Sequence, residues 1–280
     1  MSTQVSRLSP FLNTVVLGGA PQRKLAAARA AGFAAVELWH HDVATALGGA
    51  AGAREALAAE GLAAADYQVL LDFDGAAPAQ REAKRAEAIA LLNAMQNLGC
   101  RLLVVSANTA EDALGNLHAI EDDLAWLAEM AASRHIGLAY EPLAWSRWVS
   151  TLNEAADLVA RLDMPNLGLV VDAFHHLIRN RGIEELEQLP ADKVVLVQLS
   201  DTDVHETERD LSAAGYRDLA RTRRLFPGEG ILPLAELLAT LKQIGVTAPI
   251  GLEVFNERYA AADPFETAQR ARDSLRALGL

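Results

Sequence analysis

The most constraining feature of the sequence is a regular alternation of short apolar segments with longer segments rich in Ala and Leu. Each short segment is apolar at consecutive positions, which is typical of parallel strands that are buried on both faces. The predicted strands are Leu12–Leu17, Ala34–Leu38, Ala63–Val69, Arg101–Ser106, Ile136–Glu141, Leu167–Asp172, Val194–Leu199 and Pro249–Val254. The longer segments between them have helical periodicity, so the pattern predicts repeated βα units.

The helical segments and the glycines that follow them strengthen this prediction. Helices are predicted over Arg23–Ala31, Ala79–Leu98, Ala119–Arg134, Leu152–Leu162, Leu234–Ile244 and Phe265–Leu278. Glycines that we expect to be left-handed helix C-caps precede the next strand at Gly32, Gly61, Gly99, Gly137 and Gly245. Eight strands with βα alternation favour an α/β fold of the (β/α)8 TIM-barrel type over an open doubly wound sheet. No Gly-rich dinucleotide-binding pattern follows the first strand.

Length and composition fit one domain. The chain has 280 residues, of which 51% are hydrophobic and 22% are charged. No linker or shift in composition divides it, so we expect residues 1–280 to form a single TIM-barrel domain. The least regular part is Asp201–Pro227, a long polar stretch after the seventh strand. A connection of that length predicts a functional lid or a helix of its own.

Charge and cysteine content exclude several classes of protein. There are 25 Lys and Arg residues against 37 Asp and Glu residues, a net charge of −12, whereas nucleic-acid binding needs a basic surface. The single cysteine, Cys100, excludes a disulfide framework. The N-terminus has one early base, Arg7, and no segment reaches the roughly 18 apolar residues of a membrane span. We expect a cytoplasmic protein with a small-molecule substrate and no nucleic-acid or membrane partner, and a homo-oligomer is left open.

Polar side chains lie at the ends of the last four predicted strands. Glu141, Asp172 and Glu253 close the fifth, sixth and eighth strands, and Gln198 lies at the end of the seventh. Because active sites of barrels lie at the C-terminal ends of the strands, these side chains are expected to converge. Three carboxylates in one mouth would raise one another's pKa unless a cation lay between them, which indicates a divalent metal site. Gln198 either joins the ligands or donates a hydrogen bond to one of them.

The donor types predict which metal is bound. Carboxylate and amide oxygens are hard ligands, so they favour Mn²⁺ or Mg²⁺, with Co²⁺ or Zn²⁺ as less favoured occupants. His175 follows Asp172 by three positions, an offset that can turn the imidazole toward the same mouth. An imidazole beside a cation can transfer protons, and the alternative is that it holds a ligand in place. His176 is expected on the surface of a helix.

A second concentrated feature is the segment RRLFPGEG at 223–230. One proline and two glycines predict a defined turn whose backbone can approach a ligand. The two preceding arginines, Arg223 and Arg224, either hold a substrate oxyanion or carboxylate or lie at the surface.

Six segments resemble the sugar-phosphate isomerase/epimerase barrels related to xylose isomerase. In chain order they are VELW, YEPLAW, LVVDAFHHL, VQLSDT, LFPGEG and GLEVFN. The resemblance implies one divalent metal ion with the ligands Glu141, Asp172, Gln198 and Glu253. It also implies catalytic roles for His175 and Arg224 and substrate contacts at Asn108, Asp201 and Leu71. Most members of the family have His where this chain has Gln198.

Within that family, the FPGxG turn, the YE-x-LAW segment and the Gln ligand are similar to bacterial 3-dehydroshikimate dehydratases of quinate and shikimate catabolism. This resemblance implies a lyase that abstracts a proton α to a carbonyl and forms protocatechuate. The chain departs at Leu71, where a QPFRDFEG-like segment has arginine. The substrate carboxylate would then need Arg224 or Arg147, or the substrate is a neutral keto-polyol of a sugar or keto-inositol isomerase/epimerase.

Two other classes of protein share part of this pattern. Apurinic-site endonucleases use a similar barrel, but they bind several zinc ions through many histidines and have basic surfaces. Seven scattered histidines and the charge of −12 argue against that class. A metal-binding regulator without turnover would fit the same ligand set, and recovery of unchanged substrate would favour it.

Overall fold

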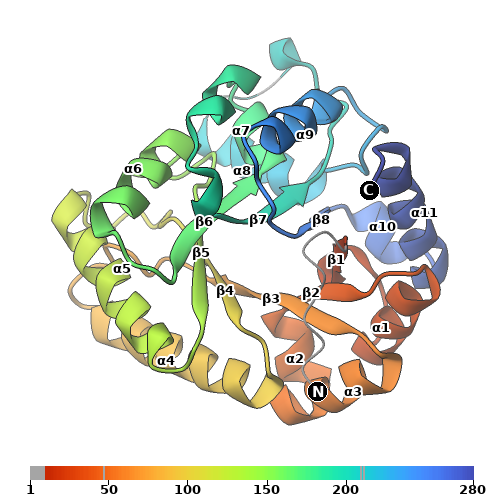
Figure 1. Ribbon diagram of the computed structural model, residues 1–280, viewed down its shortest axis with the longest axis horizontal. Coiled ribbons are helices and arrows are strands. Elements are labelled where there is room, and N and C mark those ends of the chain that lie inside the picture. Colours follow the sequence, from red (N-terminus) through yellow and green to blue (C-terminus); the bar gives the residue numbers. More distant parts are fainter. Residues whose placement is uncertain (1–9, 47, 209, 211) are drawn as a thin grey trace.

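A computed structural model of the chain describes residues 10–46, 48–208, 210 and 212–280, so Arg7 lies outside the described residues. Eight parallel strands form a closed barrel in which each strand pairs with the next in sequence, and β8 pairs with β1 (Figure 1). Helices surround the barrel on the outside (Figure 1). The predicted (β/α)8 barrel is confirmed.

All eight predicted strands are present. They are β1 (Phe11–Asn13), β2 (Ala35–Trp39), β3 (Ala63–Leu70), β4 (Leu102–Ser106), β5 (Gly137–Glu141), β6 (Leu167–Asp172), β7 (Val194–Leu199) and β8 (Ile250–Leu252). The largest difference from prediction is at β1, which ends four residues before Leu17. The Asn13 side chain accepts the N–H of Val15 at 2.8 Å and begins a single 3-10 turn at Thr14–Val16. That local cap ends the strand although the sequence stays apolar.

The six predicted helices are also present, and the described residues form five more. They are α1 (Pro21–Ala30), α2 (His40–Ala46), α3 (Gly49–Glu60), α4 (Arg81–Leu98), α5 (Leu117–Ala132), α6 (Leu152–Leu162), α7 (Ala173–Leu177), α8 (Ala213–Thr222), α9 (Leu234–Gln243), α10 (Glu257–Ala261) and α11 (Pro264–Ala277). The long stretch after β7 carries a helix of its own, α8, as predicted. No helix within the described ranges has the length and apolar character that crossing a membrane requires.

Four of the five predicted glycine caps adopt the left-handed conformation. Gly32, Gly61, Gly99 and Gly245 have φ between 65° and 91°. The prediction for Gly137 is wrong, because Gly137 is the first residue of β5. The positive φ at that place belongs to His135, with φ 57°.

The inside of the barrel is built in two layers. The lower, apolar layer consists of Phe11, Ala35, Val104, Ala139, Val170 and Leu196. Because strand side chains alternate between two faces, the residue two positions further along also points inward, one layer closer to the C-terminal ends. In the same strands these residues are Asn13, Glu37, Ser106, Glu141, Asp172 and Gln198, and all are buried. The apolar layer is therefore the floor beneath a polar site.

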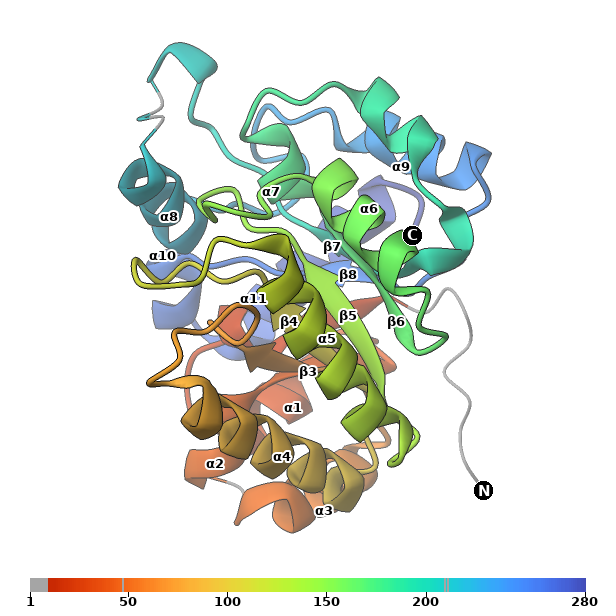
Figure 2. The ribbon, with the colours of Figure 1, turned by 90° about the vertical axis from the view of Figure 1, so that its left-hand side faces the viewer.

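The loops that surround this site gather at one end of the barrel. Figure 2 shows the loops after β3, β4 and β5 and helix α8 at the same end. At the last strand the two-residue spacing continues with Gly251 in β8 and Glu253 directly after it. A Cβ atom at Gly251 would overlap the Phe11 ring, so the missing side chain makes room for a large one in the lower layer.

Candidate active site

Helix α7 begins at the end of β6 and places two predicted site residues side by side. Asp172 is its N-cap, and Oδ1 accepts the N–H groups of Phe174 at 2.7 Å and His175 at 3.4 Å. These first N–H groups have no partner inside the helix, so the cap fixes the carboxylate. The other oxygen, Oδ2, lies 3.7 Å from His175 Nε2. The spacing in VDAFHH thus turns the imidazole toward the carboxylate, as predicted.

Glu141 at the end of β5 completes a cluster with these two residues. It accepts the Ser106 hydroxyl at 2.6 Å and lies 3.8 Å from His175 Nε2. One ligand atom each of Glu141, Asp172 and His175 lie within 4.8 Å of one another, and all three residues are buried. These residues could hold a metal ion. The strand-end rule selected Glu141 and Asp172 as ligands, whereas His175 was expected to transfer protons.

Arg224 lies at the centre of the site, with 1% of its surface exposed. Nη1 donates to Asp172 Oδ2 at 2.8 Å and to Glu253 Oε2 at 3.0 Å. Nη2 lies 3.0 Å from His175 Nε2, which must accept this bond because a guanidinium only donates. Nε donates to the Ala220 carbonyl of α8 at 2.9 Å. Arg224 was expected to hold substrate oxygens, and in the structure two carboxylates balance its charge.

Glu253, which follows β8, is also held by amides from β1 and β3. Its Oε1 accepts the Gln68 amide at 2.7 Å, and Asn13 Nδ2 lies 3.4 Å away. Asn13 Nδ2 also donates to Glu37 at 2.6 Å. Side chains of β1 and β3 therefore position the Glu253 carboxylate, which follows β8.

Gln198 at the mouth of β7 has its amide oriented by Glu37. Gln198 Nε2 donates to Glu37 Oε1 at 2.7 Å. A carboxylate oxygen accepts and an amide nitrogen donates, so this bond decides which way the amide faces. Gln198 Oε1 is buried and accepts no hydrogen bond within the described part of the chain. A buried acceptor without a donor is rare, and it fits a metal ligand.

Negative charge is in excess in this site. Burial and the charges of Glu253 and Asp172 raise the pKa of Glu141 well above its usual value. Burial raises the pKa of Glu253 to about 7, although Arg224 pulls it down. Asp172 differs, because Arg224 and His175 outweigh burial and lower its pKa. One guanidinium thus does not balance the carboxylates, and a divalent cation would.

His175 is neutral at neutral pH. Burial lowers the pKa of His175 to about 3, against the opposing pull of Asp172, and Arg224 lowers it further. The Trp145 ring packs edge-on against the imidazole at 5.0 Å between centroids. The imidazole is therefore neutral, and its Nε2 can take up a proton only when the Arg224 hydrogen bond to it is displaced.

A cavity of about 330 Å³ opens onto these groups. That volume is within the range of about 300–1,000 Å³ found for small-molecule sites. Its polar lining comprises Gln68, Ser106, Glu141, His175, Arg221, Arg224 and Glu253. Its apolar lining comprises Trp39, Val69, Leu71, Leu143, Trp145, Ala220 and Phe255. The arrangement suits a small molecule with a flat apolar part and several oxygens.

The other residues predicted to contact substrate lie in different settings. Leu71 lines the cavity and is 38% exposed. Asn108 builds a loop, because its Nδ2 donates to the Asp74 carbonyl at 2.9 Å and its Oδ1 accepts the Ala110 N–H at 2.9 Å. The guanidinium of Arg147 lies over the ring of the neighbouring residue Trp148, at 5.5 Å from the ring centroid.

Asp201 supports the turn at 227–230. Its carboxylate accepts the backbone N–H groups of Gly228 at 3.0 Å, Gly230 at 3.1 Å and Leu232 at 2.9 Å. Since these three donors occupy the carboxylate, Asp201 shapes the segment that carries Arg224.

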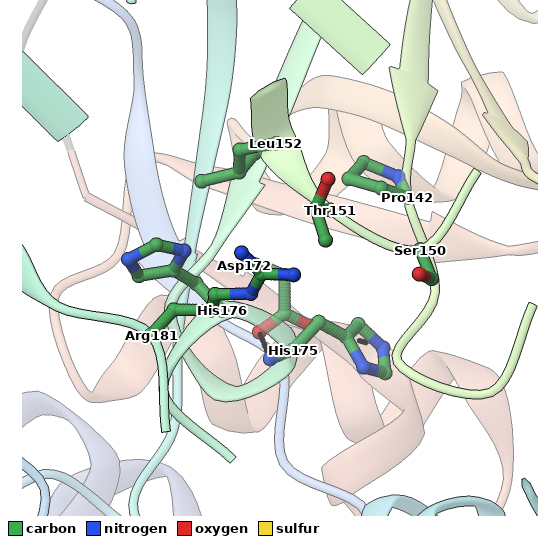
Figure 3. A pocket seen from close by; sticks show the side chains of 8 residues that line it. All are labelled: Pro142, Ser150, Thr151, Leu152, Asp172, His175, His176 and Arg181. Carbon is green, nitrogen blue, oxygen red and sulfur yellow. Dashed lines mark hydrogen bonds and ion pairs between the residues drawn. The ribbon is translucent and has the colours of Figure 1, made fainter. Parts of the chain in front are cut away.

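His176 does not lie on the helix surface, and that prediction is wrong. Its ring is buried, and Nε2 donates to the Gly182 carbonyl at 3.0 Å. Figure 3 shows the His176 ring pointing away from the His175 ring. A pocket of about 10 Å³ between them, also lined by Asp172 and Arg181, has the volume of one water molecule. His176 therefore holds the connection after α7 and lies apart from the substrate cavity.

Sequence reasoning missed the contributions of the first four strands. Asn13, Glu37, Gln68 and Ser106 are all buried and bonded to the site carboxylates or to Gln198. Three of them follow an inward apolar residue by two positions, as Glu141 follows Ala139. The strand-end rule would have identified Glu37 and Ser106 at the predicted ends of the second and fourth strands, but not Asn13, because the first strand was predicted to continue to Leu17.

The family model described as a xylose isomerase-like TIM barrel matches residues 25–278. The chain belongs to this family. The resemblance inferred from VELW, YEPLAW and the later segments is thereby confirmed.

Individual relatives of this xylose isomerase-like barrel are enzymes or solved barrels. The chain is 39% identical over 267 residues to 3-dehydroshikimate dehydratase of Pseudomonas aeruginosa, covering 95% of the chain and 40% of the relative. It is 29% identical over 126 residues to inosose isomerase of Bacillus licheniformis, covering 45% of the chain and 42% of that protein. A solved xylose isomerase-like TIM barrel/4-hydroxyphenylpyruvate dioxygenase fusion protein has a TM-score of 0.90 and 32% identity, over 97% of this chain and 42% of that one. The chain spans about two fifths of the Pseudomonas relative's length.

Proposed function

We propose that the chain is a divalent-metal-dependent lyase that converts 3-dehydroshikimate to protocatechuate. The observation that carries the proposal is the convergence of Glu141, Asp172 and Glu253 with a neutral His175 beneath a cavity of substrate size. The identity of 39% over 95% of the chain to a 3-dehydroshikimate dehydratase supports the same substrate.

The donor set fits a divalent metal ion. Glu141, Asp172, Gln198 and Glu253 would hold it. The unpartnered Oε1 of Gln198 and the raised pKa values of Glu141 and Glu253 are the features that such an ion would satisfy. Oxygen donors favour Mn²⁺ or Mg²⁺, and an imidazole contribution from His175 would shift the preference toward Zn²⁺ or Co²⁺. When bound, the ion polarises the ketone of the substrate.

The residues around the donor set transfer the proton, stabilise the developing charge and contact the ring. Neutral His175 takes the proton next to the ketone through Nε2 once bound substrate has displaced the Arg224 hydrogen bond from that nitrogen. The released Arg224 donor stabilises the negative charge that develops as the proton leaves. The hydroxyl group β to the ketone then departs as water with the proton that His175 accepted. Loss of a proton from the ring CH2 group and protonation of the ketone oxygen complete the aromatic ring of protocatechuate. The aromatic wall formed by Trp39, Trp145 and Phe255 packs against the ring.

The second candidate is an isomerase of a neutral keto-polyol such as a keto-inositol. Leu71 in the cavity wall favours it, because an apolar side chain stands there in place of a cation. The inosose isomerase relative points the same way. The first proton transfer would be identical, and return of the proton to a neighbouring carbon would complete the isomerisation.

A direct comparison of substrates tests the proposal. Protein loaded with Mn²⁺ or Mg²⁺ is incubated with 3-dehydroshikimate or with a keto-inositol, and the products are followed by absorbance and mass. Protocatechuate from 3-dehydroshikimate is the expected result. An isomerised keto-inositol without protocatechuate would replace the dehydratase by the isomerase, and two unchanged substrates would indicate a binding protein.

A further inference from the structure

Two arginines, Arg221 and Arg224, line the cavity, and they differ in whether a carboxylate balances their charge. Arg224 is buried and forms ion pairs with Asp172 at 2.8 Å and Glu253 at 3.0 Å. Arg221, in the last turn of α8, is exposed. Within the ranges that the structure describes, no ion pair or hydrogen bond engages the Arg221 guanidinium. Arg221 therefore brings an unbalanced positive charge to the cavity.

Helix α8 holds Arg221 in place at the cavity. Three side chains of the helix pack in a small apolar cluster with the segments after β5, β6 and β7. The cluster consists of Ala144, Phe174, Ile178, Val204, Tyr216, Leu219 and Ala220. The carbonyl of Ala220 also accepts the Nε–H of Arg224. The backbone of Arg221 is thus tied to the site, and ligand binding has to order only its side chain.

The other basic groups near the mouth have different partners. Arg223 pairs with Asp203 at 3.0 Å. Arg147 lies over the Trp148 ring. Leu71 lines the cavity at the position where the QPFRDFEG-like segment has arginine. Among these arginines, Arg221 is the cavity-lining residue whose charge has no partner in the part of the chain that the structure describes.

We propose that Arg221 binds the carboxylate of the substrate, so that α8 supplies the anion specificity that the segment after β3 lacks. This inference rests on the proposed function. A carboxylate in a partly apolar cavity needs a charged partner, because the desolvation of an unpaired anion is costly. A guanidinium can offer it two parallel N–H donors. The substrate is then held by its carboxylate at the exposed end of the cavity and by its ketone near Glu141 and His175 at the buried end.

A pair of ligands that differ only in the carboxylate isolates this contact. Protocatechuate carries the carboxylate, and catechol is the same ring without it. Calorimetric titration of the Mn²⁺-loaded full chain gives the ratio of the two dissociation constants for wild type, Arg221→Ala and Arg223→Ala. The two variants lose the same charge from neighbouring exposed positions, so the second controls for the long-range field. The expected ratio favours protocatechuate by roughly 10- to 100-fold in wild type and Arg223→Ala, the size of a charge-assisted hydrogen bond, and approaches one in Arg221→Ala.

Kinetics with 3-dehydroshikimate separate this inference from the proposed function. Arg221→Ala is expected to raise KM roughly 10- to 100-fold with kcat within about threefold, because the carboxylate is bound equally in the ground state and the transition state. Arg221→Lys should recover part of the loss, since a single ammonium group lacks the paired donors. Wild-type turnover with an unchanged KM and ligand ratio in Arg221→Ala would overturn the role of Arg221 while the dehydratase stands. A ligand ratio that depends on Arg221 without any turnover would leave anion binding in place and overturn the dehydratase.

Discussion

Replacing Glu253 by glutamine should make the metal-free protein more stable at pH 8. Burial raises the pKa of Glu253 from its ordinary 4.5 to about 7. Gln has the size of the protonated carboxyl group, but it cannot ionise. Wild type and Glu253→Gln should therefore have similar stability where Glu253 is protonated and diverge where it is charged.

The difference between the pKa of Glu253 in the folded and unfolded states sets the sign and size of the change in stability. A carboxyl group whose pKa is raised in the folded state binds more protons there, so folding stability falls as the pH rises from 4.5 toward 7. At about 1.4 kcal/mol per pKa unit, the raised pKa of Glu253 lowers the free energy of unfolding by about 1 kcal/mol at pH 5 and by about 3 kcal/mol at pH 8. The advantage of Glu253→Gln should thus grow by roughly 2 kcal/mol between these pH values. Loss of the Glu253 charge also lowers the pKa of Glu141, which acts in the same direction.

Urea unfolding in the presence of a chelator measures this difference at pH 5 and pH 8. Glu187→Gln, at an exposed position, is the control and should stay within about 0.5 kcal/mol of wild type at both pH values. Addition of Mn²⁺ at pH 8 should stabilise wild type and leave Glu253→Gln unchanged. The reasoning would be refuted if wild type and Glu253→Gln differed in free energy of unfolding by the same amount at both pH values. A more stable wild type at pH 8 would refute it as well.

Three further substitutions test the ligands and the cavity wall. Gln198→His should keep a metal site but shift its preference toward Zn²⁺ or Co²⁺, since imidazole is the softer donor, and competition binding with an unchanged preference would remove Gln198 from the ligand set. Glu37→Gln should weaken Mn²⁺ binding by about 10- to 100-fold without unfolding the protein, because an amide does not force the Gln198 oxygen toward the metal, and wild-type affinity would contradict this role. Leu71→Arg should leave KM for 3-dehydroshikimate unchanged or lower it, and a higher KM would show that position 71 lies away from the carboxylate.

The barrel was predictable because each buried strand carries its own apolar run. Leu167–Asp172 and Val194–Leu199 have the predicted bounds, and so does helix Leu152–Leu162. Errors occurred where a side chain or a single φ angle overrides the pattern. The Asn13 cap ends β1 early, and His135 takes the left-handed conformation that was assigned to Gly137.

The site was predictable as far as the strand ends determine it. Glu141 and Asp172 lie together because parallel strands end at one mouth. Whether a carboxylate balances the charge of Arg224 depends on a contact with Asp172 across 52 residues, and the sequence pattern contains no information on such pairs. Asp201 was likewise expected to contact substrate, but backbone N–H groups of a distant turn occupy its carboxylate.

The central claim is that the reaction depends on a metal ion held by the strand-end side chains. The direct measurement is a titration of chelator-treated protein with Mn²⁺ in which bound metal and protocatechuate formation are followed together, for wild type and Glu141→Gln. We expect activity to return in proportion to bound metal and to reach its maximum at one ion per chain, whereas folded Glu141→Gln regains neither metal nor activity. Full turnover of 3-dehydroshikimate by the metal-free protein, or by Glu141→Gln, would contradict the account.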